Sequence, residues 1–171
     1  LFIKYTINAK DYVVYDVKCS NALKDTILKY NGIPIECKTG HSIIKNKIIE
    51  YNSKLGGEMS GHIFFSDKYF GYDDAVYVSL RLIEILIKTG VKLSALVDLI
   101  PVYVSTPEIR LECNDDNEKN NIVKKVYEYF TKNYNCSTID GVKVFFDNGW
   151  GLIRSSNTQP VIVLRFEANS L

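Results

Sequence analysis

Short runs of β-branched and aromatic residues alternate with helical stretches over residues 1–90 of this chain. The expected strands are Tyr12–Val17, Ile33–Cys37 and Ile63–Phe65. Each is followed by a segment whose apolar residues recur at helical spacing. The order β-α-β-α-β-α requires crossover connections, which build a parallel or mixed sheet with helices on its faces. The sequence therefore predicts an α/β domain over residues 1–90.

The first two helices have recognisable ends. The first is expected over residues 21–30, capped by Ser20 or Asn21 and stopped by Asn31-Gly32, because Asn and Gly tolerate positive φ. The second is expected from about Ser42 to about Leu55, with Gly56-Gly57 ending it. Its apolar positions, which recur at three-to-four spacing, are Ile44, Ile48 and Leu55.

A pair of aspartates precedes the third and longest helix. Asp73 or Asp74 is expected to cap that helix, which is the more frequent role of such a pair than a magnesium site. The apolar stripe of the helix includes Val76, Leu80, Ile83 and Leu86.

The pattern changes after Gly90. A short helix is expected over 93–100, an extended strand interrupted at Thr106-Pro107 over 102–113, and a helix over 118–133 capped by residues 114–117. Short strands follow at 137–139, 142–146, 151–154 and 161–168. One helix among several antiparallel strands is an α+β arrangement, so a second domain is predicted over residues 91–171.

The composition is that of a globular protein. Of 171 residues, 46% are hydrophobic and 24% charged, which excludes disordered, collagen-like and low-complexity chains. The formal net charge of +1 argues against a dedicated nucleic-acid binder, which carries a basic surplus. The apolar runs are too short to cross a membrane, and nothing at the start reads as a signal peptide.

The cysteines indicate the cellular compartment, and the first residue indicates whether the chain is whole. Four cysteines are widely spaced, with no Cys-x-x-Cys pair, so they are interpreted as reduced thiols in a cytoplasmic protein. They are Cys19, Cys37, Cys113 and Cys136. The first residue is Leu1 rather than Met, which suggests that an upstream part is missing.

A glycine-rich segment, Gly56 to His62, is the first candidate for chemistry. If the segment is extended, Glu58, Ser60 and His62 project to the same side. A carboxylate, a hydroxyl and an imidazole facing one way suit a ligand with adjacent hydroxyls, such as a sugar. The alternative is a glycine-rich turn with a capped edge strand. A metal site from Glu58 and His62 is weaker, since nothing nearby completes the ligand set, and no metal ligand is predicted.

The second candidate is the polar stretch Arg154 to Pro160, which separates two apolar strands. An arginine fork matches a phosphate, and hydroxyls and turn amides add donors without negative charge. This composition predicts a phosphate-binding turn. A plain hairpin loop rich in Ser and Asn is the alternative.

Two further side chains follow the ends of expected strands. Lys18 comes just after the first strand and His41 after the second. Ligands of open α/β sheets collect beyond the carboxyl ends of the strands. Lys18 and His41 are therefore expected to converge with Glu58 at one edge of the sheet, although each alone is more often a surface residue.

Five segments, in this order along the chain, carry a resemblance to a known family. They are Asp16-Val17-Lys18-Cys19, Lys38-Thr39-Gly40-His41, Gly57-Glu58-Met59-Ser60-Gly61-His62, Gly71-Tyr72-Asp73-Asp74 and the stretch Gly149–Pro160. Together they resemble the bacterial phosphomannomutase/phosphoglucomutase family of the α-D-phosphohexomutase superfamily. That family has four domains, and the resemblance covers the last two: an α/β third domain and a TATA-binding-protein-like fourth domain.

The resemblance implies a function that this chain carries only in part. In the family a phosphoserine of the first domain exchanges its phosphoryl group with a hexose phosphate through a 1,6-bisphosphate intermediate. Mg²⁺ is held by an Asp-Gly-Asp-Gly-Asp loop of the second domain. Neither loop occurs in this sequence, so the implied partners are hexose phosphates and the missing N-terminal domains. A non-catalytic sugar-phosphate-binding fragment or pseudoenzyme is the alternative.

The resemblance also implies roles for single residues. Glu58 and Ser60 would bind vicinal sugar hydroxyls, while Lys18, His41 and His62 would line the cleft, with Lys18 or His41 as general acid/base. Met59 favours mannose and glucose phosphates, so dual specificity is predicted. The residues implied to hold the phosphate that is not transferred are Arg154, Ser156, Asn157 and Thr158.

Overall fold

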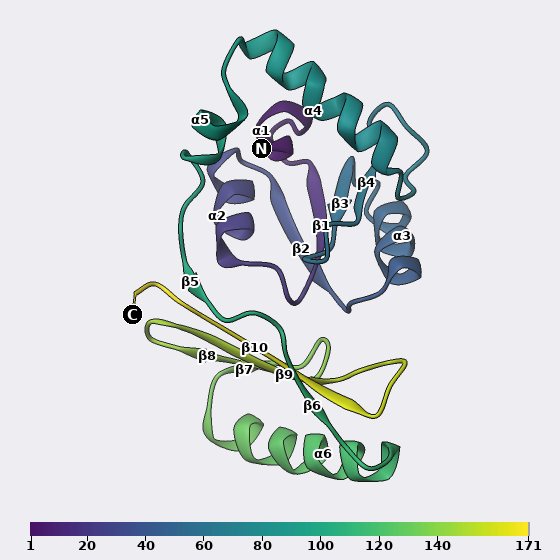
Figure 1. The fold of residues 1–171 in the computed structure, drawn as a ribbon, viewed down its shortest axis with the longest axis vertical. Helices are drawn as coiled ribbons and strands as arrows, with labels where there is room; N and C mark the ends of the chain where they lie inside the picture. Colours follow the sequence, from purple (N-terminus) through teal and green to yellow (C-terminus); the bar gives the residue numbers. More distant parts are fainter. Residues whose placement is uncertain (171) are drawn as a thin grey trace. The chain divides into compact units, whose positions relative to one another are not determined.

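A computed structural model describes residues 1–170 and divides the chain into two compact units. Unit 1 is Leu1–Val102 and unit 2 is Tyr103–Leu171 (Figure 1). The sequence pattern placed the change after Gly90, whereas the compact unit continues through helix α5 (Leu93–Val97), which buries Leu96. Among the described residues, no helix combines the length and apolarity needed to span a bilayer.

Unit 1 is built on a mixed sheet, as predicted, but with four strands rather than the three expected. Its strands lie in the order β2-β1-β3-β4. The central strand β1 runs parallel to β2 and β3, and β4 is an antiparallel edge strand. Their bounds are Tyr12–Asp16 (β1), Ile33–Cys37 (β2), Leu55–Gly57 (β3) and Ile63–Phe65 (β4).

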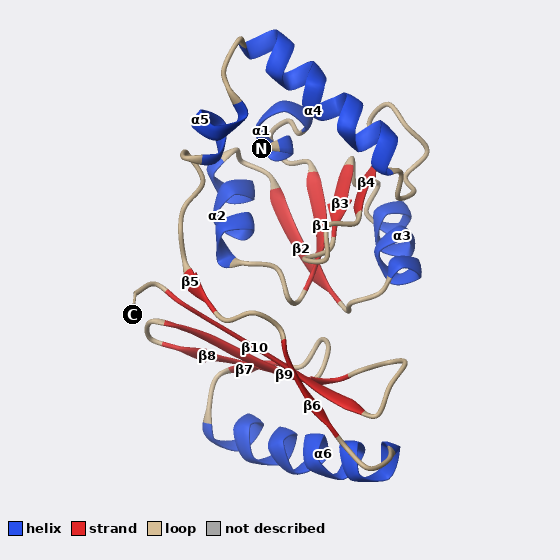
Figure 2. Cartoon of the chain, viewed as in Figure 1, coloured by secondary structure: helices blue, strands red, loops and turns tan. Residues whose placement is uncertain are grey.

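Helices cover both faces of this sheet (Figure 2). Alternate residues of β1 point to opposite faces: Val13 and Tyr15 join one buried cluster with Ile27 of α2, and Val14 joins another with Ile44 of α3. The result is a three-layer α/β unit. The helices are α1 (Phe2–Thr6), α2 (Asn21–Lys29), α3 (His41–Glu50) and α4 (Ala75–Thr89).

The ends of α2 follow the sequence prediction. Ser20 is the N-cap, and its side chain accepts a hydrogen bond from the N–H of Ala22 at 3.1 Å. Beyond the helix, Asn31 adopts a φ of +58°. Gly32 is needed for space, because a Cβ there would lie 2.6 Å from Cδ1 of Ile7.

The predicted extension of the second helix to Leu55 is wrong. Helix α3 ends at Glu50, and Asn52 then turns the chain with a φ of +48°. Leu55 therefore lies in β3, and the two following glycines are strand residues. Gly56 has no room for a side chain, since a Cβ would lie 2.7 Å from Cδ1 of Ile48. The glycine permits close packing of α3 on the sheet.

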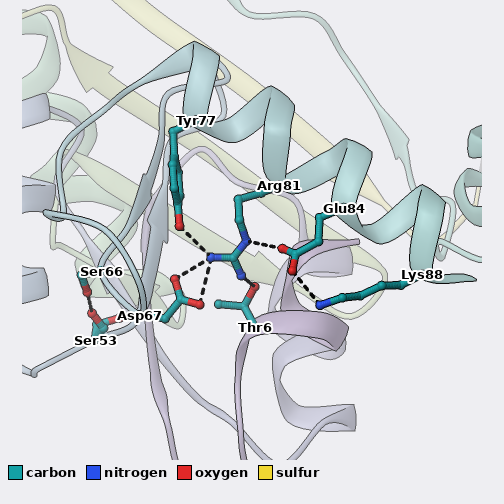
Figure 3. Close-up of polar contacts among 8 residues, drawn as sticks. All are labelled: Thr6, Ser53, Ser66, Asp67, Tyr77, Arg81, Glu84 and Lys88. Carbon is teal, nitrogen blue, oxygen red and sulfur yellow. Dashed lines mark hydrogen bonds and ion pairs between the residues drawn. The ribbon is translucent and has the colours of Figure 1, made fainter.

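Helix α4 buries the charged Arg81 as well as the apolar Ile85. Asp74 is its N-cap, accepting from the N–H of Tyr77 at 2.9 Å. The buried Arg81 donates to both oxygens of Asp67, at 2.8 and 2.9 Å, and to Oγ1 of Thr6 (Figure 3). This network ties α4 to α1 and to the loop after β4. The apolar stripe predicted for this helix is not its buried face, because three of its residues are exposed: Val76, Leu80 and Ile83.

Unit 2 is an antiparallel sheet with one long helix, as the α+β prediction requires. The strand order is β5-β10-β9-β8-β7, and β6 also pairs with β10. Helix α6 (Asp116–Asn133) packs on β8, β9 and β10. The strands are β5 (Val104–Ser105), β6 (Ile109–Glu112), β7 (Cys136–Ser137), β8 (Val142–Phe146), β9 (Gly149–Ser155) and β10 (Val161–Ala168).

The core of unit 2 comes from the three longest strands. Val144, Leu152 and Val163 are buried, and Trp150 donates its indole N–H to Oε1 of Glu167 at 3.1 Å. All four cysteines of the chain are free of disulfides.

Candidate functional site

The segment between β3 and β4 is a tight turn. The N–H of Glu58 donates to the carbonyl of His62 at 2.9 Å, and the N–H of Gly61 donates to the carbonyl of Glu58 at 3.0 Å. Gly61 adopts a φ of +95°, a conformation suited to glycine. The extended geometry expected for this segment is therefore wrong, because these bonds close the chain into a hairpin.

The turn nevertheless presents its polar groups together. Ser60 donates its hydroxyl to Oε2 of Glu58 at 3.1 Å. The other carboxylate oxygen, Oε1, is buried and has no hydrogen-bond partner among the described residues. A buried acceptor without a partner is unfavourable by about 1–3 kcal/mol. A ligand hydroxyl would satisfy it once a rotation of the Glu58 side chain exposes the oxygen.

A buried carboxylate that sequence reasoning missed holds this turn in place. Asp16, at the end of β1, is fully buried. Its Oδ1 accepts from the N–H of Met59 at 3.2 Å and from Sγ of Cys19 at 3.1 Å, and its Oδ2 accepts from Oγ1 of Thr39 at 3.1 Å. Asp16 thus joins the segments that follow β1, β2 and β3. The resemblance included Asp16 in a motif, but only tertiary pairing reveals its contacts.

Two histidines meet at Asp73 beside the turn. Nδ1 of His62 lies 2.7 Å from Oδ2 of Asp73, and Nε2 of His41 lies 3.4 Å from the same oxygen. The N–H of Ile63 donates to the other oxygen, Oδ1, at 3.1 Å. Burial raises the pKa of the Asp73 carboxyl, but these hydrogen bonds outweigh it and hold that pKa below its usual value. Asp73 is therefore not the helix cap; Asp74 fills that position.

Lys18 lies at the same edge of the sheet. The pairing of Asp16 with Cys37 and of Tyr15 with Gly57 brings the carboxyl ends of the three parallel strands side by side. Lys18 follows the first of these ends, and its side chain is buried rather than solvated.

The second candidate segment is the connection between β9 and β10. Ser156 is buried, and its N–H donates to the carbonyl of Val161 at 2.8 Å, which closes the loop. Asn157 and Thr158 are exposed at the tip. The N–H of Thr158 points to Oγ of Ser156 at 3.4 Å.

A buried lysine from another element fixes this loop. Nζ of Lys119, on the first turn of α6, donates to the carbonyls of Ser156 and Gln159, both at 3.1 Å, and to Asp116 at 2.6 Å. Sequence reasoning missed Lys119, because a lysine near a helix start is ordinarily a solvated residue. No local signal marks it.

Arg154 is buried at the start of the same loop. Its Nε donates to Oδ2 of Asp140 at 2.8 Å, and this ion pair is almost fully enclosed. Its Nη2 is buried and has no hydrogen-bond partner among residues 1–170. One buried donor of the guanidinium is therefore left unused by the described residues.

Comparison with known families matches both units. Residues 1–103 match "Phosphoglucomutase/phosphomannomutase, alpha/beta/alpha domain III", and residues 108–171 match "Phosphoglucomutase/phosphomannomutase, C-terminal domain". These two stretches cover nearly the whole chain.

Individual relatives give the same result. The chain is 44% identical to the phosphomannomutase/phosphoglucomutase of Pseudomonas putida, covering 92% of this chain and 34% of that protein. It is 38% identical to the phosphoglucomutase of Neisseria gonorrhoeae, covering 92% and 35%. A crystal structure of a phosphoglucomutase/phosphomannomutase family protein from Burkholderia thailandensis matches with a TM-score of 0.81 and 41% identity, over 95% of this chain and 34% of that one.

The chain spans about a third of the length of these relatives. The expected resemblance is confirmed, and so is the expectation that it covers only the C-terminal part of the relatives. On the family matches and the shared fold, this chain belongs to the phosphoglucomutase/phosphomannomutase family, of which it represents domain III and the C-terminal domain.

Proposed function

We propose that this chain is the sugar- and phosphate-recognising part of a phosphohexomutase that interconverts hexose 1-phosphates and 6-phosphates through a 1,6-bisphosphate. Family membership supports the reaction class, and relatives carry the names phosphomannomutase and phosphoglucomutase. Because the chain spans a third of those relatives, turnover belongs to a longer protein.

The observation that carries the proposal is the unpartnered oxygen Oε1 of Glu58. Ser60 occupies the second oxygen and so orients the carboxylate. A carboxylate fixed in this way accepts hydrogen bonds from the adjacent hydroxyls of a hexose, and the Ser60 oxygen accepts or donates another. This turn therefore recognises the sugar ring through its hydroxyls.

In unit 2, the loop after Arg154 is proposed to hold the phosphate that is not transferred. Nη2 of Arg154 supplies a charged donor, and Ser156, Asn157 and Thr158 supply neutral ones. Lys119 points its ammonium at the loop carbonyls, which turns those acceptors away from an anion. One arginine with neutral donors binds a phosphate without holding it as tightly as a cluster of cations would.

Proton transfer is assigned to the side chains at the carboxyl ends of the parallel strands of unit 1, where His41 and His62 meet Asp73. Lys18 and His41 are candidates from the sequence, and the contact of Nδ1 of His62 with Asp73 supports His62 as a third. A carboxylate on one ring nitrogen leaves the other to accept a proton from the attacking sugar hydroxyl and to return it in the reverse step. Removing that proton makes the hydroxyl oxygen a better nucleophile toward a phosphoryl group.

The phosphoserine and the Asp-Gly-Asp-Gly-Asp loop are absent from these 171 residues. The Mg²⁺ that the family uses would therefore be held by other domains. A non-catalytic sugar-phosphate-binding protein is the second candidate. Mutase activity of the complete gene product, measured with mannose 1-phosphate and glucose 1-phosphate, separates the two.

Calorimetry on the chain tests recognition directly. Glu58→Gln is expected to weaken mannose 1-phosphate binding by about tenfold or more, because a charged hydrogen bond contributes about 1.5–3 kcal/mol, and to leave inorganic phosphate binding unchanged. Arg154→Lys should weaken both ligands. Glu50→Gln, an exposed acid on α3, is the matched control. Equal affinity of Glu58→Gln and the parent chain for the sugar phosphate would contradict the proposal.

Substrate choice is proposed to be dual. Recognition through hydroxyls away from C2 does not separate mannose from glucose. Met59 packs against the buried cluster of unit 1 and gives its N–H to Asp16, so its influence on the sugar acts through the position of the turn. A preference of the complete enzyme above about a thousandfold, roughly 4 kcal/mol, would contradict dual specificity.

A further inference from the structure

His41, His62 and Asp73 form a convergent set of metal-ligating atoms. One ligand atom from each residue lies within 4.8 Å of the other two. The residues come from three places: the start of α3, the residue before β4, and the segment before α4. The sequence pattern does not predict this set, because it indicates a helix cap at Asp73 or Asp74.

The three side chains are held before any ligand arrives. The N–H of Ile63 fixes Oδ1 of Asp73, which leaves Oδ2 facing both imidazoles. The ring of His41 lies edge-on to Phe64, with centroids 4.8 Å apart, and to His62 at 5.4 Å. Each histidine side chain is 49% exposed, so water and ions reach the nitrogens.

Two imidazoles and one carboxylate select for a particular class of cation. Zn²⁺, Co²⁺ and Ni²⁺ accept such mixed nitrogen and oxygen ligands, whereas Mg²⁺ prefers oxygen alone. Three protein ligands with a fourth position open to water is the arrangement of catalytic zinc sites. Ligands bind at about 2.0–2.2 Å from zinc, so small side-chain rotations bring atoms at these separations onto one ion.

We propose that His41, His62 and Asp73 form a site for a divalent transition-metal ion of the zinc class. The ion replaces the hydrogen bond between His62 and Asp73, so that Nδ1 of the neutral His62 ring offers its lone pair to the ion and the ring proton is carried by Nε2. A second part rests on the proposed function: because His62 belongs to the sugar-phosphate site, the bound ion and the hexose phosphate compete.

Zinc calorimetry on the full chain tests the site, with Co²⁺ absorption to identify the ligands. We expect one Zn²⁺ per chain, no comparable binding of Mg²⁺, and a Co²⁺ spectrum without thiolate charge-transfer bands. Asp73→Asn and His62→Gln should each weaken Zn²⁺ at least tenfold. Asp74→Asn is the matched control, since it removes a neighbouring charge and Asn also caps helices. Circular dichroism of each metal-free variant confirms that it is folded.

Three results would overturn the site: unchanged Zn²⁺ affinity in folded Asp73→Asn, thiolate bands with Co²⁺, or equal binding of Mg²⁺. The competition is tested separately, by titrating Zn²⁺ in the presence of saturating mannose 1-phosphate. A several-fold loss of apparent Zn²⁺ affinity supports it. Triad-dependent Zn²⁺ binding that the sugar phosphate leaves unchanged would overturn the competition while the metal site stands. Failure of mannose 1-phosphate to bind at all would count against the proposed function alone.

Discussion

Asp16 shows how one buried side chain can organise a loop edge. It is fully buried, yet it accepts hydrogen bonds from Met59, Cys19 and Thr39. Removing an acceptor from such a place leaves its donors without partners, which is more destabilising than the loss of the hydrogen bonds themselves. The carboxylate is therefore a positioning residue for the turn between β3 and β4.

Asp16→Ala is expected to lower the free energy of unfolding by about 3 kcal/mol, because several buried donors lose their acceptor. Urea denaturation measures this change. Asp98→Asn, at an exposed aspartate of the same unit, should change stability by less than about 0.5 kcal/mol. Equal stability of Asp16→Ala and the parent chain would show that the donors find other partners.

Asp73 carries a pH dependence whose sign follows from its lowered pKa. The folded pKa lies below the usual 3.8. The ionised carboxylate therefore contributes stability that is fully present above pH 3.8 and is lost as pH falls through the folded value. As pH falls below about 3.8, the stability of the parent chain should fall more than that of Asp73→Asn. Parallel curves for the two proteins would refute this assignment.

At the scale of elements, α6 and the loop after β9 behave as one piece because of Lys119. Lys119→Met is expected to lower the free energy of unfolding by about 1–3 kcal/mol, since two loop carbonyls lose their donor. It should also weaken inorganic phosphate binding. Lys124→Met, an exposed lysine of the same helix, is the control. Phosphate affinity that is the same in both variants would remove Lys119 from the positioning role.

Helix α4 offers a pair of apolar residues with opposite environments. Leu80 is 58% exposed and Ile85 only 4%. Ile85→Ala is expected to lower the free energy of unfolding by about 2–4 kcal/mol, whereas Leu80→Ala should change it by less than about 0.5 kcal/mol. Thermal or urea denaturation of the two variants gives the comparison. A large loss at Leu80 would mean that another part of the chain covers it in solution.

At the scale of the whole molecule, each unit has its own core. Unit 1 buries two clusters around its sheet, and unit 2 buries residues of β8, β9 and β10. Residues 1–102 and residues 103–171 are therefore expected to fold when expressed separately. Cooperative unfolding of each fragment, followed by circular dichroism, is the measurement. A fragment without a cooperative transition would show that its core needs the rest of the chain.

Much of the architecture could be predicted from local pattern. The strands Ile33–Cys37, Val142–Phe146 and Val161–Ala168 have the predicted bounds, because alternating or continuous apolar runs between turn residues are local signals. The end of α3 could not be placed. Asn52 competes there with Gly56-Gly57 as the stop, and only packing on Ile48 shows why the glycines belong to a strand.

The site was predictable in its residue types and not in its contacts. The motifs indicated Glu58, Ser60 and the loop after Arg154 as candidates. Asp16 and Lys119 were missed, because their roles depend on partners many residues away in the chain. The adjacent pair Asp73-Asp74 predicts a helix cap. The contacts of Asp73 with His41 and His62 were not predictable, because these histidines come from other segments of the chain. Tertiary hydrogen bonds of this kind produce no periodic pattern in the sequence from which they could be predicted.

On the proposed function, the unsatisfied oxygen of Glu58 also predicts how synthetic analogues of the sugar should bind. An oxygen that only accepts requires a donor opposite it. A fluorodeoxy hexose phosphate keeps the shape of the ring but replaces a donor with an atom that cannot donate. Compounds altered at the carbon facing Glu58 should bind poorly, and those altered elsewhere on the ring should not, so a fluorine scan would map which edge of the sugar enters the turn.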